Sequence, residues 1–269
     1  MFNEFPKKRA IITGGASGLG KAFAELLLAD NWIVGIADNN AEQIAGTVAG
    51  WSRYSGQVFS LQVDVTEPDD IRRLADAFIQ RHGGVDVVIN CAGIGSGGAF
   101  ETVSLATFKQ VMEINFNGVL HSCKTFVPVL LAQRAGLIIN ISSVAAFGAA
   151  PTMSAYNVSK AAVTALTETL QAEYSTRGLR FAVVMPTFFR SNLNRTLLSE
   201  GKAREIADKL ITQAKVDAPW VARKTLRKVD RGAFYVVIPT DSAVIWFFKR
   251  HFPRLYLKIV DFLAKQQGL

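Results

Sequence analysis

The segment LIINISSVAAFGAAPTMSAYNVSK, residues 137–160, places a strand, a loop and the start of a helix in direct succession. Its first five residues form an apolar run that predicts a buried strand, and the alanine-rich sequence from Ala155 predicts a helix. Tyr156 and Lys160 are four residues apart, so they share one face of that helix. Because Ser143 follows the strand, a hydroxyl, a phenol and an ammonium group can converge on one small volume.

This set of side chains suits proton transfer to or from an alcohol oxygen. A tyrosine with its ordinary pKa of about 10 is a poor base at neutral pH, and a nearby cation favours its phenolate form. A Tyr-x-x-x-Lys pair alone is common on helix surfaces, so its meaning depends on the rest of the chain.

The composition predicts a packed α/β globule, with residues 1–269 as a single domain. The chain has 269 residues, of which 49% are hydrophobic. Cys91 and Cys123 give no disulfide framework, and no signal peptide or spanning apolar run of about 20 residues is visible, so we expect a cytoplasmic protein. The net charge of +8 indicates either an anionic partner or simply a soluble basic protein. No nucleic-acid motif is present, and we expect neither a nucleic acid nor a metal as ligand.

The segment RAIITGGASGLG, residues 9–20, predicts a strand, a glycine-rich turn and a helix N-terminus. Free amides and the helix dipole would face the same point, which is typical of an anion site. The spacing Thr-Gly-x-x-x-Gly-x-Gly differs from the commoner Gly-x-Gly-x-x-Gly pattern. The first glycine would make the turn, the second would admit a pyrophosphate, and the third would let the helix pack on the strand. The residues of this loop that we expect to contact a dinucleotide are Gly14, Ser17, Gly18, Leu19 and Gly20.

The next predicted strand, residues 32–37, ends at Asp38. An acidic residue about 20 positions after the glycines can accept hydrogen bonds from an adenosine ribose, and it would repel the extra phosphate of NADP. We therefore expect NAD rather than NADP, although Asp38 could also be an ordinary loop or helix-capping residue.

Further strands are predicted at residues 58–63 and 85–89, with a helix between them that begins with Thr66 as N-cap and has Pro68 in its first turn. Strands that alternate with helices predict an α/β fold with a single doubly wound parallel sheet of about seven strands. Ligands of such sheets bind beyond the carboxyl ends of the strands. Those ends carry Gly14, Asp38, Asp64, Asn90, Ser142 and Ser143.

Taken in order, these motifs resemble the short-chain dehydrogenase/reductase family over roughly residues 7 to 192, and this resemblance implies a Rossmann fold. The matching positions are Thr13 to Gly20, Asp64, Asn90 to Gly93, Asn115, Ser143, Tyr156 and Lys160. Each motif is weak alone, whereas the ordered set is specific.

The resemblance also implies roles for individual residues. Tyr156 would be the acid/base, Lys160 would lower its pKa and hold the nicotinamide ribose, and Ser143 would bond the substrate oxygen. Asn115 would kink its helix and position a water, although its sequence alone also suits a helix-surface amide. The other positions expected at the cofactor are Asp64 and Val65 near the adenine, Asn90 as support for the central strand, and Ala92, Gly93, Pro186 and Phe188.

The chain departs from the family pattern at two places. Cys91 stands where a second Asn is common, and we expect it to be a small buried side chain. After the strand predicted at residues 180–185, Thr187 replaces the usual Gly and Ser191 stands where Thr is usual. Phe188 and Phe189 either wall the pocket or are ordinary core aromatics.

The last third of the chain is expected to select the substrate. Residues 190–215 predict a mobile or helical lid, with a plain surface helix pair as the alternative. Residues 217–229 predict a helix, and residues 233–238 predict the seventh strand.

The tail, residues 242–269, is apolar and basic. An apolar run to residue 248 is followed by Lys and Arg residues among aromatic and aliphatic ones, and Pro253 predicts a division into two short helices. Such a pattern suits a helix in a membrane interface, and the alternative is packing on the lid, on the rest of the domain or on a partner subunit. By resemblance we expect a homo-oligomer, a dimer or tetramer.

The sequence therefore predicts an NAD(H)-dependent oxidoreductase that acts on a hydrophobic secondary alcohol or ketone, such as a lipid, a steroid or a long-chain compound. One alternative is a 3-oxoacyl-thioester reductase, which usually uses NADP. Another is a non-catalytic Rossmann protein that senses NAD(H) or acts as a scaffold.

Overall fold

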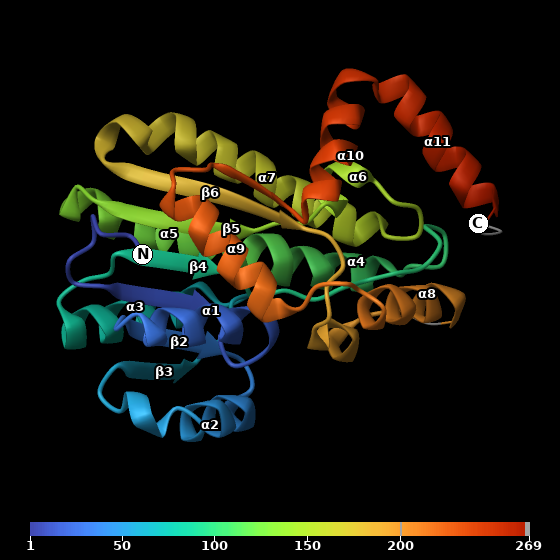
Figure 1. Ribbon diagram of the computed structural model, residues 1–269. Helices are drawn as coiled ribbons and strands as arrows, with labels where there is room; N and C mark the ends of the chain where they lie inside the picture. The colour runs from blue at the N-terminus through green and yellow to red at the C-terminus, as the bar shows by residue number, and fades with distance from the viewer. Residues whose placement is uncertain (200, 267–269) are drawn as a thin grey trace.

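The computed structural model describes residues 1–199 and 201–266, which form one seven-stranded parallel sheet with helices on both faces (Figure 1). This confirms the expected fold class. The strands lie in the order β3-β2-β1-β4-β5-β6-β7. Their bounds are β1 Arg9–Thr13, β2 Ile33–Asp38, β3 Val58–Gln62, β4 Val87–Asn90, β5 Gly136–Ile141, β6 Leu179–Pro186 and β7 Tyr235–Ile238.

The helices connect these strands and continue past the last one. Their bounds are α1 Gly18–Ala29, α2 Ala41–Ala49, α3 Pro68–His82, α4 Leu105–Met112, α5 Gly118–Gln133, α6 Ala145–Gly148, α7 Ser154–Tyr174, α8 Gly201–Thr212, α9 Ala218–Asp230, α10 Thr240–His251 and α11 Pro253–Gln266. The tail does divide at Pro253, and residues 190–215 are largely helical, as the sequence predicts.

Apolar side chains fill the space on both faces of the sheet. On one face, Phe23 and Leu27 of α1 and Leu226 of α9 pack against the strands. On the other face, Phe78 of α3 and Phe126 of α5 do the same. Each side chain of this kind stabilises the fold by about 1.5–3 kcal/mol when fully buried. Since both faces are covered, the central strands such as β4 and β5 are mostly apolar, whereas the edge strand β3 alternates apolar and polar residues.

The strand order reverses between β1 and β4, because β2 and β3 lie on one side of β1 and the later strands lie on the other. The loops that follow β1 and β4 therefore leave the sheet in opposite directions and create a crevice at its carboxyl edge. The candidate functional site lies there.

The N-cap of α3 differs from the expectation. The capping position is Glu67 rather than Thr66, and Pro68 is the first helical residue. The hydroxyl and the backbone N–H of Thr66 both donate to Asp64 Oδ1, at 2.7 and 2.9 Å. Asp64 and Thr66 thus form a hydrogen-bonded turn directly before the capping residue Glu67, whose own side chain makes no capping hydrogen bond.

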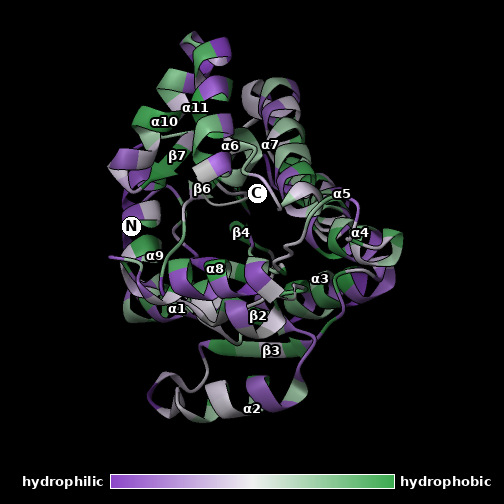
Figure 2. Cartoon of the chain, turned by 90° about the vertical axis from the view of Figure 1, so that its right-hand side faces the viewer, coloured by the Kyte–Doolittle hydropathy of each residue, from purple (hydrophilic) through white to green (hydrophobic). Residues whose placement is uncertain are grey.

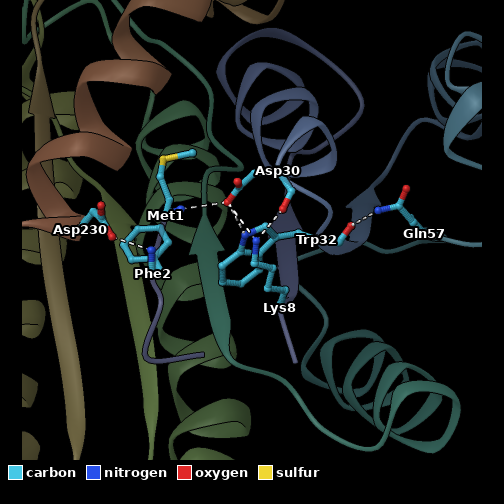
Figure 3. Close-up of polar contacts among 7 residues, drawn as sticks. All are labelled: Met1, Phe2, Lys8, Asp30, Trp32, Gln57 and Asp230. Atoms are coloured by element: carbon cyan, nitrogen blue, oxygen red, sulfur yellow. Dashed lines mark hydrogen bonds and ion pairs between the residues drawn. The ribbon is translucent and has the colours of Figure 1, made fainter. Parts of the chain in front are cut away.

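The amino-terminal segment packs at the end of the sheet opposite the crevice (Figure 1), and Figure 3 shows its polar contacts. The fully buried Phe2 ring meets the Trp32 ring edge-on, with 5.9 Å between ring centroids. The Phe2 backbone N–H donates to Asp230 of α9, and Asp30 accepts hydrogen bonds from the Met1 ammonium and from Trp32 Nε1. This segment therefore joins the end of α1 to the end of α9.

Candidate active site

The glycine turn after β1 packs directly against the segment that follows β4. Thr13 Oγ1 accepts hydrogen bonds from the backbone N–H groups of Cys91 and Ala92, at 3.1 and 3.3 Å. Gly14 has φ +65°, and a Cβ there would lie 2.8 Å from Ala92 Cα. Glycine is therefore required at position 14, both for its backbone conformation and for this close approach.

The start of α1 forms a cradle suited to a pyrophosphate. Gly18 has φ +51°, and the space where its Cβ would project is open. A Cβ on Gly20 would collide with the Gly14 carbonyl oxygen, so Gly20 lets the helix begin against the turn. Ser17 is the N-cap residue and makes no side-chain capping hydrogen bond. An anion at this position would meet the backbone amides and the positive end of the helix dipole.

Asp38 lies at the end of β2, directly beside the glycine turn. Its Oδ2 accepts from the backbone N–H of Ala16 at 3.2 Å, and its Oδ1 accepts from that of Asn40 at 3.3 Å. These hydrogen bonds fix the carboxylate at the edge of the crevice. The side chain is half-buried, so it can also receive hydrogen bonds from a ligand.

Asp64 and Val65 both follow β3, at the same edge of the sheet as Asp38. Asp64 is exposed, and Val65 is buried against Gly118, where an added Cβ would lie 2.7 Å from the Val65 side chain. The chain therefore approaches the start of α5 closely at this point.

Asn90 is buried and supports the central strands. Its Nδ2 donates to Asn140 Oδ1 at 2.8 Å, and Asn140 Nδ2 donates to Thr167 Oγ1 at 3.0 Å. This chain of hydrogen bonds joins β4, β5 and α7 beneath the crevice. The sequence analysis did not find Asn140 or Thr167. A polar residue inside an otherwise apolar strand was the available signal for Asn140.

Asn115 is fully buried in a π-helical segment, Glu113–Asn117, that interrupts the helix between α4 and α5. Its Oδ1 accepts from the Ile94 N–H at 2.8 Å, and its Nδ2 donates to the Ile94 carbonyl at 2.9 Å and to Ser159 Oγ at 3.1 Å. Since a π-helical turn inserts an extra residue, it turns this amide inward. The helix is thus irregular at Asn115, and Asn115 is not a surface amide.

Ser143, Tyr156 and Lys160 converge at the end of β5, as their spacing predicts. The Lys160 ammonium lies 5.7 Å from the centre of the Tyr156 ring and donates to the Ile141 carbonyl at 2.9 Å. Ser143 Oγ donates to the Pro186 carbonyl at 3.3 Å and accepts from the Ala145 N–H. Gly93 lies beside this group, where an added Cβ would be 3.0 Å from Asn115 Oδ1 and 3.4 Å from Lys160 Nζ.

Burial dominates the protonation of this group. It raises the pKa of Tyr156, and hydrogen bonding with Ser143 opposes that effect. Burial also lowers the pKa of Lys160 to about 8. The pKa of Tyr156 therefore shifts in the opposite direction to the one expected from sequence, because desolvation of the phenolate outweighs the hydrogen bond with Ser143.

The two cysteines are neutral thiols. Burial raises the pKa of Cys91 and of Cys123 to about 12 in each case. Cys91 is only partly buried and Cys123 is buried, and Cys123 Sγ lies within 3.9 Å of Asn90 Nδ2. The expectation of a small packed side chain at position 91 is thus met in part.

A cavity of about 390 Å³ opens beside Ser143 and Tyr156. Pro186, the last residue of β6, and Phe188 form part of its wall. Thr187 and Phe189 also line it, and Phe189 packs against the core of the sheet as well. The cavity continues between α8 and α11, which lie on either side of the carboxyl edge (Figure 2). Most of its lining is apolar: from α8 come Ala203, Ile206, Ala207, Leu210 and Ile211, and from the tail come Ile245, Tyr256, Val260, Leu263 and Ala264.

The structure thus combines a parallel Rossmann sheet, a glycine cradle at a helix N-terminus and a Ser-Tyr-Lys group beside an apolar cavity. These features define a nucleotide-binding oxidoreductase. Residues 8–202 match the family model described as short chain dehydrogenase, and the chain belongs to that family.

Two curated relatives and one solved structure illustrate the similarity. The chain is 32% identical to the 2-(R)-hydroxypropyl-CoM dehydrogenase of Xanthobacter autotrophicus, over 84% of this chain and 93% of the relative. It is 30% identical to the 3beta-hydroxysteroid dehydrogenase 1 of Eggerthella lenta, over 81% of this chain and 85% of the relative. A short-chain dehydrogenase/reductase of Burkholderia phymatum in complex with NAD superposes with a TM-score of 0.87 at 27% identity, covering 92% of this chain and 94% of the other.

Proposed function

We propose that this protein is an NAD(H)-dependent oxidoreductase that interconverts an apolar secondary alcohol and the corresponding ketone. The observation that carries the proposal is the cavity of about 390 Å³, whose lining is mostly apolar while Ser143 and Tyr156 stand on one wall. A site with few polar groups in an apolar enclosure selects an apolar ligand and orients it by its oxygen. The Eggerthella lenta relative, which is named as a hydroxysteroid dehydrogenase, supports this substrate class.

In this proposal the nicotinamide ring supplies the hydride chemistry, while residues of the chain bind the substrate and move the proton. Ser143 holds the substrate oxygen, Tyr156 exchanges a proton with it, and Lys160 binds the nicotinamide ribose. Because burial raises the pKa of Tyr156, the phenol is protonated at neutral pH and can donate to the oxygen of a ketone that is being reduced. Oxidation of the alcohol requires the phenolate, so its rate should increase with pH.

The preference for NAD rests on Asp38. Its carboxylate is fixed at the edge of the crevice by the Ala16 and Asn40 amides, where an adenosine ribose would lie. A phosphate on that ribose would be repelled by this charge. The NAD complex of the Burkholderia phymatum protein supports the same choice.

The first test is turnover with NAD or NADP on secondary alcohols graded by chain length and ring count. We expect activity to rise with apolarity, and we expect the Tyr156→Phe variant to lose about 10²–10⁴-fold in turnover. Its affinity for NADH should stay within about twofold of the wild-type value, measured by the fluorescence of the bound cofactor. A Tyr156→Phe variant with normal turnover excludes this mechanism, and NADH binding without turnover on every member of the panel favours a sensor of NAD(H).

A further inference from the structure

The last two helices expose an unusual amount of apolar surface. Among the described residues, nine of the thirteen large hydrophobic side chains that are exposed lie between positions 244 and 263. They include Phe247 on α10, which is 57% exposed, and Phe262 on α11, which is 60% exposed. An exposed apolar cluster of this kind marks a surface that binds another protein or a membrane.

The helix α11 has three distinct sides. Tyr256, Val260, Leu263 and Ala264 recur at helical spacing and line the cavity. Leu255, Ile259 and Phe262 recur at the same spacing along an adjacent side and are exposed. The polar residues of the remaining side are Arg254, Lys258, Asp261 and Lys265.

The hairpin formed by α10 and α11 is strongly basic. It carries Lys249, Arg250, Arg254, Lys258 and Lys265 against Asp261 and the N-terminal Asp241. Within the part of the chain that the structure describes, neither Arg254 nor Lys258 has a carboxylate ion-pair partner. Lys249 and Arg250 lie over the rings of Tyr256 and Trp246, at 5.2 and 5.6 Å from the ring centroids. A second copy of this surface would be repelled by its charge, whereas an anionic surface would be attracted.

The catalytic cavity reaches the solvent at this hairpin. Ile245, Leu263 and Leu210 of α8 line the cavity and are also exposed, so its mouth lies between α8 and the hairpin. Tyr256 holds α11 at this mouth through a hydrogen bond of 2.7 Å from its hydroxyl to the Gly148 carbonyl of α6. The exposed apolar surface and the opening of the cavity are therefore continuous.

We infer that the α10–α11 hairpin binds the surface of an anionic lipid bilayer and places the mouth of the catalytic cavity against it. Apolar side chains enter the interface while the Lys and Arg side chains reach the headgroups. Within the described residues, no helix has the length and apolar content needed to cross a bilayer, so the contact is peripheral. Delivery of the substrate from the bilayer rests on the proposed function, whereas binding to the bilayer does not.

The test is sedimentation of the purified chain with phosphatidylcholine vesicles that contain or lack phosphatidylglycerol. We expect the wild type to sediment with the anionic vesicles at low salt and to be released as the salt concentration rises. The double variant Phe247→Gln/Phe262→Gln should bind at least about tenfold more weakly. The double variant Arg254→Gln/Lys258→Gln should bind about 25-fold more weakly, at about fivefold for each cation removed.

Matched controls remove similar groups elsewhere on the surface. Phe100→Gln/Leu105→Gln removes two exposed apolar side chains outside the hairpin, and Lys109→Gln/Lys124→Gln removes two exposed cations on α4 and α5. Both controls should sediment like the wild type, and all variants should keep the wild-type melting temperature. A wild type that never sediments overturns the inference, as do controls that lose binding equally. A dimer that Phe247→Gln/Phe262→Gln converts to a monomer assigns the surface to a second copy instead and also overturns it.

A separate readout distinguishes this inference from the proposed function. Anionic vesicles should lower the KM of the wild type for a long-chain secondary alcohol and leave that of the Phe247→Gln/Phe262→Gln variant unchanged. Vesicle binding without turnover on any alcohol would leave the docking surface in place and refute the proposed activity. Turnover without vesicle binding would refute the docking surface and leave the proposed activity in place.

Discussion

At the scale of single residues, the phenol and the ammonium of the candidate active site are both held in an environment that opposes their charge. Burial raises the pKa of Tyr156 and lowers that of Lys160 to about 8. The Ile141 carbonyl accepts a hydrogen bond from Lys160, but its partial charge does not replace the water that burial removes. The chain therefore loses stability by keeping a cation at this position, which agrees with the role proposed for Lys160 at the cofactor.

This cost makes the stability depend on pH in a predictable direction. The pKa of Lys160 is about 8 in the folded chain, against 10.5 for an ordinary lysine. Between these values the unfolded chain binds a proton that the folded chain has released, so stability rises with pH. From pH 8 to pH 10, the free energy of unfolding should rise by about 2 kcal/mol in the wild type relative to Lys160→Met. Urea titrations at several pH values measure the free energy of unfolding of both proteins. If that free energy changed with pH in parallel for the two proteins, the assigned pKa would be contradicted.

Asp38 allows a second prediction at this scale. Asp38→Ala removes the carboxylate beside the glycine turn, so NAD loses its ribose contact and NADP loses the repulsion that excludes it. We expect NAD affinity to fall about tenfold, by the loss of a charged hydrogen bond, and the ratio of NAD to NADP affinity to fall further. Titration of both cofactors by fluorescence measures the two effects. A wild type that already prefers NADP would show that Asp38 does not select the cofactor.

At the scale of elements, the sequence predicts the parts of the site that follow strands. Each buried strand is an apolar run, and the polar residue at its carboxyl end is therefore conspicuous; Asp38, Asn90 and Ser143 were found in this way. The π-helical turn at Asn115 has no such signal, because its conformation depends on the backbone of Ile94, 21 residues earlier in the chain. Its place in the site came from family resemblance.

The walls of the cavity are a second part that sequence could not place. Helical spacing identifies an apolar side of α8 and another of α11, but it does not show that the two sides face each other. The two helices are separated by α9, β7 and α10 along the chain, and the cavity brings them together. The tail thus proves to be a wall of the cavity, which was one of several alternatives for it.

The position of α8 gives a prediction for substrate size. Ala207 lines the cavity, so Ala207→Phe should occupy part of its volume of about 390 Å³. We expect the KM for ring-containing secondary alcohols to rise by about 10–200-fold and the KM for short-chain alcohols to change little, since a misfit of a few methylene groups costs about 1–3 kcal/mol. Lys209→Phe, on the exposed side of α8, is the matched control and should leave both values unchanged. Equal effects of the two substitutions would mean that α8 does not shape the pocket.

At the scale of the whole molecule, the candidate active site and the packed amino-terminal segment lie at opposite ends of the sheet. The polar residues of the site lie at the carboxyl ends of the strands, whereas the amino-terminal segment packs between the ends of α1 and α9. Phe2, Trp32 and Asp230 meet there, far along the chain from one another. Substitutions at that end should therefore affect folding without affecting catalysis.

Phe2→Ala tests this separation. Phe2 is fully buried, so its truncation should destabilise the fold by about 3–5 kcal/mol. Well below the melting temperature, NADH affinity and kcat/KM should remain within about twofold of the wild-type values. Thermal unfolding followed by circular dichroism measures the loss of stability. The absorbance and fluorescence of the cofactor measure kcat/KM and NADH affinity. A large loss of kcat/KM in folded Phe2→Ala would show that the two ends are coupled.

The neutral state of the two thiols has a practical consequence for spectroscopy. With a pKa of about 12, fewer than about one in ten thousand molecules of Cys91 or Cys123 is a thiolate at neutral pH, and the thiolate is the form that maleimides attack. The native chain should therefore give almost no background labelling. A single cysteine introduced on the exposed side of α11 would carry a fluorophore without any need to remove the native cysteines. Its emission would then report the polarity around that helix in solution and on vesicles.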